Sequence, residues 1–152
     1  MKDLLHIRYA NEHDAAVIAE FNRAMAKETE NKILDISVVS AGVDNLMKNP
    51  EYGFYLVAEQ HGQVTGCLMI TTEWSDWRNG IFWWIQSVYI SPEYRRRGVF
   101  SQMYTHIRNL ANQQEDICGL RLYVENNNHA AQTTYHHLGM LKTNYGMFEE
   151  EF

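Results

Sequence analysis

The stretch IFWWIQSVYISPEYRRRGVFS, residues 81–101, is the most informative segment of this chain. Its first ten residues are nearly all apolar or aromatic, which predicts a strand covered on both faces. Pro92 ends the strand, because proline cannot donate to a sheet ladder. Three arginines and Gly98 follow in a short turn, and apolar residues then recur at helical spacing from Val99 onwards. The segment therefore predicts a strand, a basic turn and a helix, in that order.

The start of this helix is suited to bind an anion. The amides of a helix's first turn have no partner within the helix, and the helix dipole favours negative charge beside them. The arginines at 95–97 add positive charge at the rim of the turn. Because neither G-x-x-x-x-G-K-[ST] nor G-x-G-x-x-G is present, the sequence predicts a diphosphate cradle made of backbone and not a P-loop. A solvated basic turn is the alternative interpretation.

Alternating strand and helix patterns surround this segment. Four more strands are predicted near residues 4–9, 52–59, 64–74 and 117–124, and three more helices are predicted to begin at Asn11, Asp35 and Asn128. The tail, residues 140–148, has room for one or two further short strands. We therefore expect an α/β or α+β fold, with a mixed sheet of six to seven strands flanked by about four helices. The strands at 81–90 and 117–124 should be parallel, and residues 1–152 should form a single domain.

The composition excludes several classes of protein. Apolar residues make up 45% and charged residues 21% of the 152 residues, which is ordinary globular composition. No apolar run could span a membrane, and the N-terminus is too polar for a secretory signal, so we expect a cytoplasmic protein without a membrane partner. The net charge of −6 argues against nucleic acid as a partner. Cys67 and Cys118 are expected to be small core residues, and no metal-site spacing is present.

A second motif, LYVENNNHAAQTTYHHLGM, occupies residues 122–140. It places Asn128 at a helix start, Ala131 and Tyr135 on one helix face, and Gly139 just after the helix. The strand before this helix and the strand at 81–90 should end at the same edge of the sheet, where α/β proteins usually bind ligands.

With both motifs in this order, the chain resembles the GCN5-related N-acetyltransferases, the GNAT superfamily, over nearly its whole length. The pyrophosphate motif of that superfamily is [Q/R]-x-x-G-x-[G/A]. Arg95 and Gly98 match its first two fixed positions, whereas Phe100 departs from the small residue expected last. The ring of Phe100 could crowd a diphosphate, although a side chain can turn away while its backbone amide still points inwards.

The resemblance implies acetyl-CoA as the donor co-substrate. It also implies that main-chain groups of residues 88–90, left free at a bulge, hold the pantetheine arm and stabilise the developing oxyanion. The residues that the resemblance assigns to the cofactor are Val88, Tyr89, Ile90, Arg95, Arg96, Arg97, Gly98, Val99, Phe100, Ser101, Asn128, Ala131 and Tyr135.

Acetyl transfer to an amine also needs an acid and a base. Tyr135 is the residue that the resemblance offers as general acid for the leaving thiolate. An alkyl amine with a pKa of about 10.4 is almost fully protonated at pH 7, so the site needs a base, a water chain to one, or a pocket that lowers the amine pKa. Some GNAT members carry a glutamate on the strand that here contains Gln86, and an amide cannot act as a base.

The remaining candidates for the base are Glu28 and Glu73, with Glu30 and Asp76 in the same two segments. Each could equally be a solvated surface carboxylate. Four tryptophans lie near the second segment, namely Trp74, Trp77, Trp83 and Trp84. Aromatic walls beside carboxylates suit an organic cation, although these tryptophans could instead form a large aromatic core. The residues expected at the acceptor site are Glu28, Glu30, Trp74, Asp76 and Trp77.

The interpretation that follows is an acetyl-CoA-dependent N-acetyltransferase that acts directly, in a ternary complex, on a primary amine of a small molecule. A protein lysine or N-terminal acetyltransferase is the alternative enzyme. A non-catalytic module that binds acyl-CoA is the alternative from another class, since the strand lacks a glutamate at Gln86. The resemblance also allows a homodimer, and fold-level analogy does not identify the amine.

Overall fold

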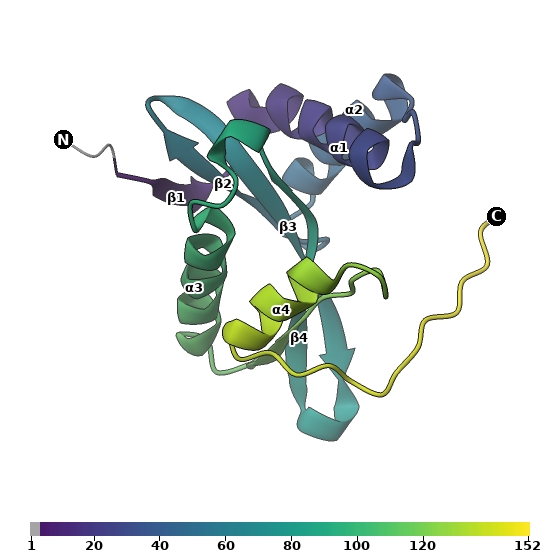
Figure 1. Ribbon diagram of the computed structural model, residues 1–152. Helices are drawn as coiled ribbons and strands as arrows, with labels where there is room; N and C mark the ends of the chain where they lie inside the picture. The colour runs from purple at the N-terminus through teal and green to yellow at the C-terminus, as the bar shows by residue number, and fades with distance from the viewer. Residues whose placement is uncertain (1–3) are drawn as a thin grey trace. The chain divides into compact units, whose positions relative to one another are not determined.

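Five strands form one sheet in the computed structural model, which describes residues 4–152 (Figure 1). The sheet order is β1-β2-β3-β4-β5, and neighbouring strands are antiparallel except β4 and β5, which are parallel as predicted. The strands are β1 (His6–Tyr9), β2 (Phe54–Gln60), β3 (Gln63–Ser75), β4 (Gly80–Ile90) and β5 (Ile117–Arg121).

The chain divides into two compact units, one ending at Leu122 and one beginning at Tyr123. The first contains the sheet and three helices, and the second contains the fourth helix and the tail. The four predicted helices are thus confirmed as α1 (Ala15–Glu30), α2 (Ile36–Lys48), α3 (Val99–Asn112) and α4 (His129–His137).

The predicted helix caps are present. Asn11 and Asp14 form a reciprocal capping box at the short 3₁₀ turn that leads into α1. The Asp35 carboxylate accepts a hydrogen bond from the Ser37 amide at the start of α2. In the second unit, the Asn128 side chain accepts from the Ala131 amide, and Gly139 follows α4 with a φ of 96°. These short-range contacts explain why the helices begin where the sequence predicts them.

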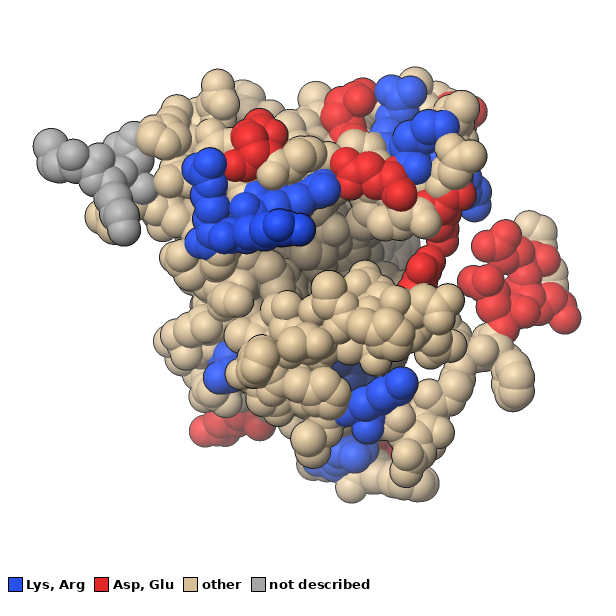
Figure 2. Space-filling view, viewed as in Figure 1, with Lys and Arg blue, Asp and Glu red and all other residues tan. Residues whose placement is uncertain are grey.

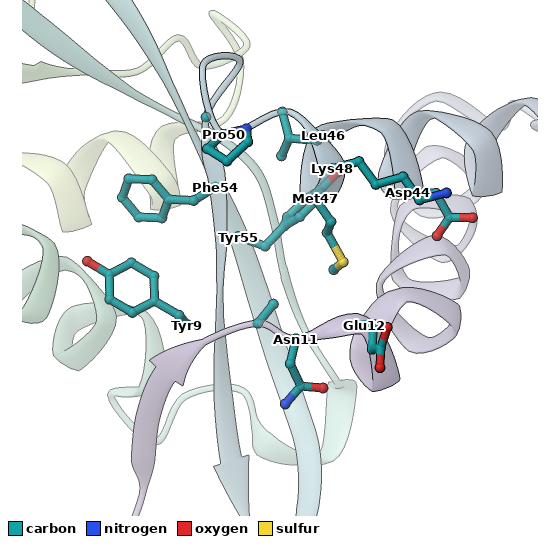
Figure 3. A pocket seen from close by; sticks show the side chains of 12 residues that line it. Tyr9, Asn11, Glu12, Asp44, Leu46, Met47, Lys48, Pro50, Phe54 and Tyr55 are labelled. Carbon is teal, nitrogen blue, oxygen red and sulfur yellow. The ribbon is translucent and has the colours of Figure 1, made fainter.

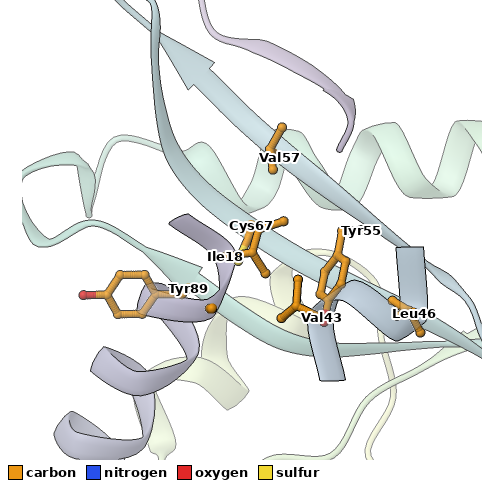
Figure 4. Close-up of a cluster of buried hydrophobic side chains, with 8 residues drawn as sticks. Ile18, Val43, Leu46, Tyr55, Val57, Cys67 and Tyr89 are labelled. Carbon is orange, nitrogen blue, oxygen red and sulfur yellow. The ribbon is translucent and has the colours of Figure 1, made fainter. Parts of the chain in front are cut away.

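The sheet of the first unit is covered by α1 and α2 on one face and by α3 on the other (Figure 1). Successive side chains of β2 point to opposite faces of the sheet, and so pack against α1 and α2 or against α3 in turn. Tyr55 and Val57 pack with Ile18 and Val43 in the cluster drawn in Figure 4. The opposite face carries Leu56, which is fully buried.

The two halves of β4 are paired differently. Residues 80–84 lie between β3 and β5, with register pairs that run from Ile81 opposite Ile117 to Trp84 opposite Arg121. Among the described residues, β5 pairs with no residue of β4 beyond Trp84, while pairing with β3 continues to Ile90. The part of β4 from 85 to 90 therefore has one edge outside the sheet ladder, and we call it the open half.

A bulge lies inside the open half, as expected from the resemblance. Met69 of β3 is opposite Gln86, but Cys67, two residues earlier, is opposite Tyr89. One residue of β3 thus faces two residues of β4, and Ser87 adopts a φ of 51°. A non-glycine residue in the left-handed region is uncommon, and it marks the point where β4 changes direction.

The structure corrects the expected number of strands, since the sheet has five and not six to seven. The tail at 140–148 was expected to add one or two strands, but it contains neither helix nor strand. Its apolar side chains, among them Leu141, Tyr145 and Phe148, are exposed. A strand is stable only when it pairs and buries one face, and the polar run at 142–144 and Gly146 interrupt the apolar alternation that this requires.

Two further expectations about strands are also corrected. β4 is not covered on both faces, because Trp84 and Gln86 are partly exposed. Cys118 is exposed, since it lies on the edge strand β5, whereas Cys67 is buried as expected. In the turn before β4, only Asn79 has a positive φ, because a 3₁₀ turn at Asp76–Arg78 closes this hairpin.

Candidate active site

The backbone of the open half of β4 offers polar groups to its outer edge. The Ser91 amide donates to the Thr65 carbonyl of β3 at 2.8 Å, and Tyr89 is opposite Cys67. Backbone groups alternate sides along a strand, so Ser91 and Tyr89 are directed towards β3. Val88 and Ile90 are therefore directed to the edge that β5 leaves unpaired, where an extended ligand can pair with them as an added strand would.

The arginine loop, residues 95–98, connects this strand to α3. Gly98 is the N-cap of α3 with a φ of 76°, a conformation that side chains rarely adopt. Among residues 4–152, no side chain caps the first turn of α3, and a Cβ on Gly98 would meet none of their atoms within 4 Å outside its chain neighbours. The first-turn amides of α3 thus lie beside open space, as a diphosphate cradle requires.

The side chains of the arginine loop differ in their partners. All three arginines are exposed, and Figure 2 shows a blue patch over the segment that precedes α3. Arg95 forms an ion pair with Glu28 at 2.8 Å and donates from Nε to the Ile90 carbonyl at 2.8 Å. Arg97 lies over the ring of Tyr94, with 5.6 Å from Cζ to the ring centroid.

Phe100 packs along α3. Its ring centroid lies 6.4 Å from that of Tyr104, one helical turn further on, and Tyr104 is buried. The side chain therefore occupies the i, i+4 ridge of the helix. Val99 is also buried, so it contributes to the cradle through its backbone, whereas Ser101 is partly exposed on the same first turn.

Polar and aromatic side chains form a stripe on one face of the β3–β4 ladder. Opposite residues in the register share a face, which places Glu73, Thr71, Trp84 and Gln86 on the same side as Tyr89. The Trp84 indole donates to the Glu73 carboxylate at 2.7 Å, and the Gln86 amide donates to the Thr71 hydroxyl at 2.7 Å. The stripe offers a carboxylate, an indole and an amide on a partly exposed surface.

The carboxylate of Glu73 is already engaged. In addition to Trp84, Arg121 of β5 donates to both of its oxygens at 3.0 and 3.2 Å. The hydrogen bond from Trp84, followed by those from Arg121, holds the pKa of Glu73 below its ordinary value. A carboxylate with a lowered pKa is a weaker base, which bears on its role below.

The other residues expected at the acceptor site do not share the surface of Glu73. Trp74 alternates to the opposite face of β3 and is 60% exposed. Trp77 is 85% exposed at the hairpin turn, and Asp76 accepts a hydrogen bond from the Trp77 amide there. Glu30, the last residue of α1, is also exposed. The indole beside Glu73 is therefore that of Trp84, and Glu28 instead lies against Tyr89 and Arg95.

The second unit carries the remaining expected residues on one short helix. Ala131 and Tyr135 lie four residues apart on α4, behind the cap made by Asn128. Burial raises the pKa of Tyr135 above its ordinary value, so the phenol keeps its proton at neutral pH.

Cysteine and metal chemistry find no support among residues 4–152. Burial raises the pKa of the Cys67 thiol to about 12, which makes it a poor nucleophile. Within this described part of the chain, no group of three or more histidine, cysteine or acidic residues could hold a metal ion. Among residues 4–152, no helix is long and apolar enough to cross a bilayer.

A pocket of about 320 Å³ lies elsewhere in the first unit, near the start of β2 and the end of α2 (Figure 3). Tyr9 and Phe54 lie on one side and Met47 lies on the other, and Glu12 and Asp44 also line it (Figure 3). None of the residues predicted for the site lines this pocket. We therefore do not assign the reaction to it.

The sequence interpretation missed Thr71 and Arg121, which complete the stripe around Glu73. It considered Trp84 only as one of the tryptophans near the hairpin, although the alternation of side chains along β3 and β4 could have placed that residue beside Glu73. The contact between Tyr89 and Glu28 joins residues 61 positions apart, for which no local pattern exists.

Comparisons with known proteins agree with this architecture. A model of the acetyltransferase (GNAT) family matches residues 10–140. A structure described as a possible acetyltransferase from Clostridium difficile 630 is 45% identical, covers 99% of both chains and has a TM-score of 0.91.

Two more distant structures share the fold. One is an aminoglycoside N-acetyltransferase in complex with CoA, 14% identical over 99% of this chain and 97% of that one, with a TM-score of 0.78. The other, from Clostridium acetobutylicum, is described as a predicted acetyltransferase with acetyl-CoA. It is 17% identical over 97% and 96% of the two chains, with a TM-score of 0.78. The resemblance drawn from the two motifs is thus confirmed, and the chain belongs to the acetyltransferase (GNAT) family.

Proposed function

We propose that this protein is an N-acetyltransferase that moves the acetyl group of acetyl-CoA to a primary amine, by direct transfer in a ternary complex. The observation that carries the proposal is the open half of β4, which leads directly into an uncapped helix start at Gly98. The open half suits the extended arm of a thioester carrier, and the helix start suits the diphosphate of the same carrier. The solved GNAT structures with CoA and acetyl-CoA support the same donor.

In the proposed arrangement, the amides of residues 98–101 hold the diphosphate, with the positive charge of the arginine loop beside it. Val88 and Ile90 pair with the amides of the pantetheine arm, and a backbone N–H near the bulge stabilises the negative charge that develops on the acetyl oxygen. We also assign Asn128 and Ala131 of α4 to the cofactor, as their motif implies, and we take residues 1–152 to act as one domain.

The transfer itself requires two proton movements. The neutral amine nitrogen attacks the acetyl carbonyl carbon, the carbon–sulfur bond breaks, and the thiolate leaves with the bonding electron pair. Tyr135 donates its proton to that thiolate, a role that its raised pKa permits at neutral pH. The proton of the attacking amine passes to a carboxylate or, through water, to solvent.

Of the two candidate bases, Glu28 is the better placed. Glu73 is held by Arg121 and Trp84, and its pKa is lowered. The carboxylate of Glu28 is also engaged, by Tyr89 and Arg95, but these contacts place it at the end of the open half. The stripe of Glu73 and Trp84 is better suited to receive the cationic amine, because a carboxylate and an indole both attract an ammonium group.

The acceptor class can be found by measuring thiol release from acetyl-CoA in the presence of different amines. Polyamines, aminoglycosides, amino acid amides, and lysine or N-terminal peptides form the arms of the screen, with Gly98→Glu as the inactive control. We expect turnover with small cationic amines. Turnover with peptides alone would identify a protein acetyltransferase, and tight CoA binding without turnover would identify a binding module.

Donor recognition can be tested separately by thermal unfolding. Acetyl-CoA should raise the melting temperature, because any ligand that binds only the folded state does so. Adenosine, which lacks the diphosphate, should raise it far less. Equal shifts from both ligands would contradict the diphosphate cradle.

The location that we propose is the cytoplasm, where acetyl-CoA is available to such an enzyme. We also propose a homodimer, which light scattering can test.

A further inference from the structure

Glu28 joins α1 to the end of β4 through both of its carboxylate oxygens. Tyr89 Oη donates to Oε1 at 3.2 Å, and Arg95 Nη2 donates to Oε2 at 2.8 Å. One of these partners belongs to the open half of β4 and the other to the arginine loop. A single carboxylate from the last helical turn of α1 therefore holds both parts of the proposed cofactor site.

Arg95 is bound from three directions. Besides Glu28, its Nε donates to the Ile90 carbonyl at 2.8 Å, and its Cζ lies 5.3 Å from the centroid of the Tyr89 ring. A planar guanidinium can satisfy a carboxylate, a carbonyl and an aromatic face at once, which a lysine ammonium cannot do with the same geometry. The side chain thus closes the arginine loop back onto the strand that precedes it.

Tyr89 connects this arrangement to the core. Its side chain is only 8% exposed, and its ring lies 4.9 Å from that of Phe21 on α1. Burial first, and the charge of Glu28 second, raise the pKa of Tyr89, so its hydroxyl stays a donor at neutral pH. The buried ring fixes the position of Oη, and Oη in turn fixes Glu28 and its partner Arg95.

We propose that Glu28 and Arg95 are positioning residues that anchor the arginine loop before the cofactor binds. With the loop tied to α1 and to Ile90, the first-turn amides of α3 are already in place, and less conformational entropy is lost on binding. The inference rests on the proposed function only in taking CoA as the ligand. It assigns Arg95 to loop order, not to direct contact with phosphate.

The direction in which Glu28→Gln changes the affinity for CoA separates this positioning role from simple electrostatics. Glu28 places a negative charge beside a site for a polyanion, so its removal should strengthen CoA binding if charge alone matters. Glu28→Gln keeps the size of the side chain but removes the ion pair with Arg95. If the anchor matters, the same substitution weakens CoA binding. If Glu28 is only a general base, turnover falls and CoA affinity is unchanged.

Isothermal titration with CoA tests the proposal on the full chain. We expect Glu28→Gln and Arg95→Gln each to raise the dissociation constant about 10-fold, the scale of a lost charged hydrogen bond. The double variant should be little weaker than either single variant, because both remove the same contact. Arg96→Gln is the matched control. It removes an equal charge from the same loop, and its effect should add fully to that of Glu28→Gln.

Arg95→Lys distinguishes geometry from charge. It keeps the positive charge but loses the guanidinium fork, so the anchor predicts an affinity close to that of Arg95→Gln. Wild-type affinity in Arg95→Lys, or unchanged or tighter CoA binding in Glu28→Gln, would overturn the proposal. Tyr89→Phe removes only the hydroxyl and should weaken CoA binding by less, which supplies a mild variant should Glu28→Gln fold poorly. Absence of CoA binding in the wild type would instead contradict the proposed function.

Discussion

The two halves of β4 differ in what their surroundings leave available. Residues 80–84 are paired on both sides, and the Phe82 ring there lies 3.7 Å from Arg121 Cζ. Residues 85–90 contain the bulge at Ser87 and have one edge outside the ladder. A fully paired strand has no backbone group to give to a ligand, whereas the open half does. The comparison teaches that the end of β5, and not the composition of β4, determines where the ligand edge begins.

Gly98→Glu should give the largest effect on CoA binding, because Gly98 lies in the loop that joins the open half to α3. The added carboxylate lies beside the proposed diphosphate and repels it, so calorimetry should detect no CoA binding. The fold should survive, since a Cβ there meets nothing within 4 Å, although the φ of 76° adds about 1 kcal/mol of strain. Retained CoA affinity would place the diphosphate elsewhere.

Tyr135→Phe sharpens the comparison by testing whether a chain with an open half also catalyses the transfer. Loss of the proton donor should lower the turnover number by about 10²- to 10⁴-fold, the usual contribution of a general acid. Acetyl-CoA affinity should change little. The loss should shrink with acyl donors whose thiol is more acidic, because a better leaving group needs less protonation. Unchanged turnover would show that water protonates the thiolate.

Gly119→Ala tests the paired half, which we expect to take no part in CoA binding. A Cβ on Gly119 would lie 2.6 Å from the Phe82 ring, and that ring is held beneath Arg121. Overpacking of this kind costs about 1–3 kcal/mol of unfolding free energy, equivalent to a fall in melting temperature of roughly 2–4 °C for each kcal/mol. CoA affinity of the folded protein should stay at the wild-type value. A large loss of CoA affinity at unchanged stability would erase the distinction between the halves.

Glu73→Gln should give the smallest effect and a characteristic pH dependence. The folded-state pKa of Glu73 is below its unfolded value, so its contribution to stability is present above the unfolded pKa and is lost as pH falls through the folded pKa. The pair with Arg121 is partly exposed, which limits the loss at pH 7 to about 0.5–1 kcal/mol. Thermal melts of wild type and variant should converge only when the pH is well below the ordinary pKa of a glutamate. A difference that persists in acid would mean that the variant perturbs packing instead.

Short-range features of this protein could be predicted from the sequence because their physical causes are local. Asn11, Asp35 and Asn128 cap helices with amides two or three residues away, and Gly98 takes a backbone conformation that other residues avoid. The apolar run at 81–90 likewise specifies a strand through its own side chains. Two such motifs in order were sufficient to indicate the family.

Other features depended on partners far away in the chain, and only the tertiary structure decided them. The number of strands depended on whether the tail finds a sheet edge to pair with, and the extent of the open half depended on where β5 stops. The contacts of Glu28 with Tyr89 and Arg95, and of Glu73 with Arg121, join residues 48 to 67 positions apart. Such contacts form only when the whole sheet brings their elements together, because the entropy of closing so long a loop is repaid by packing and not by local preference.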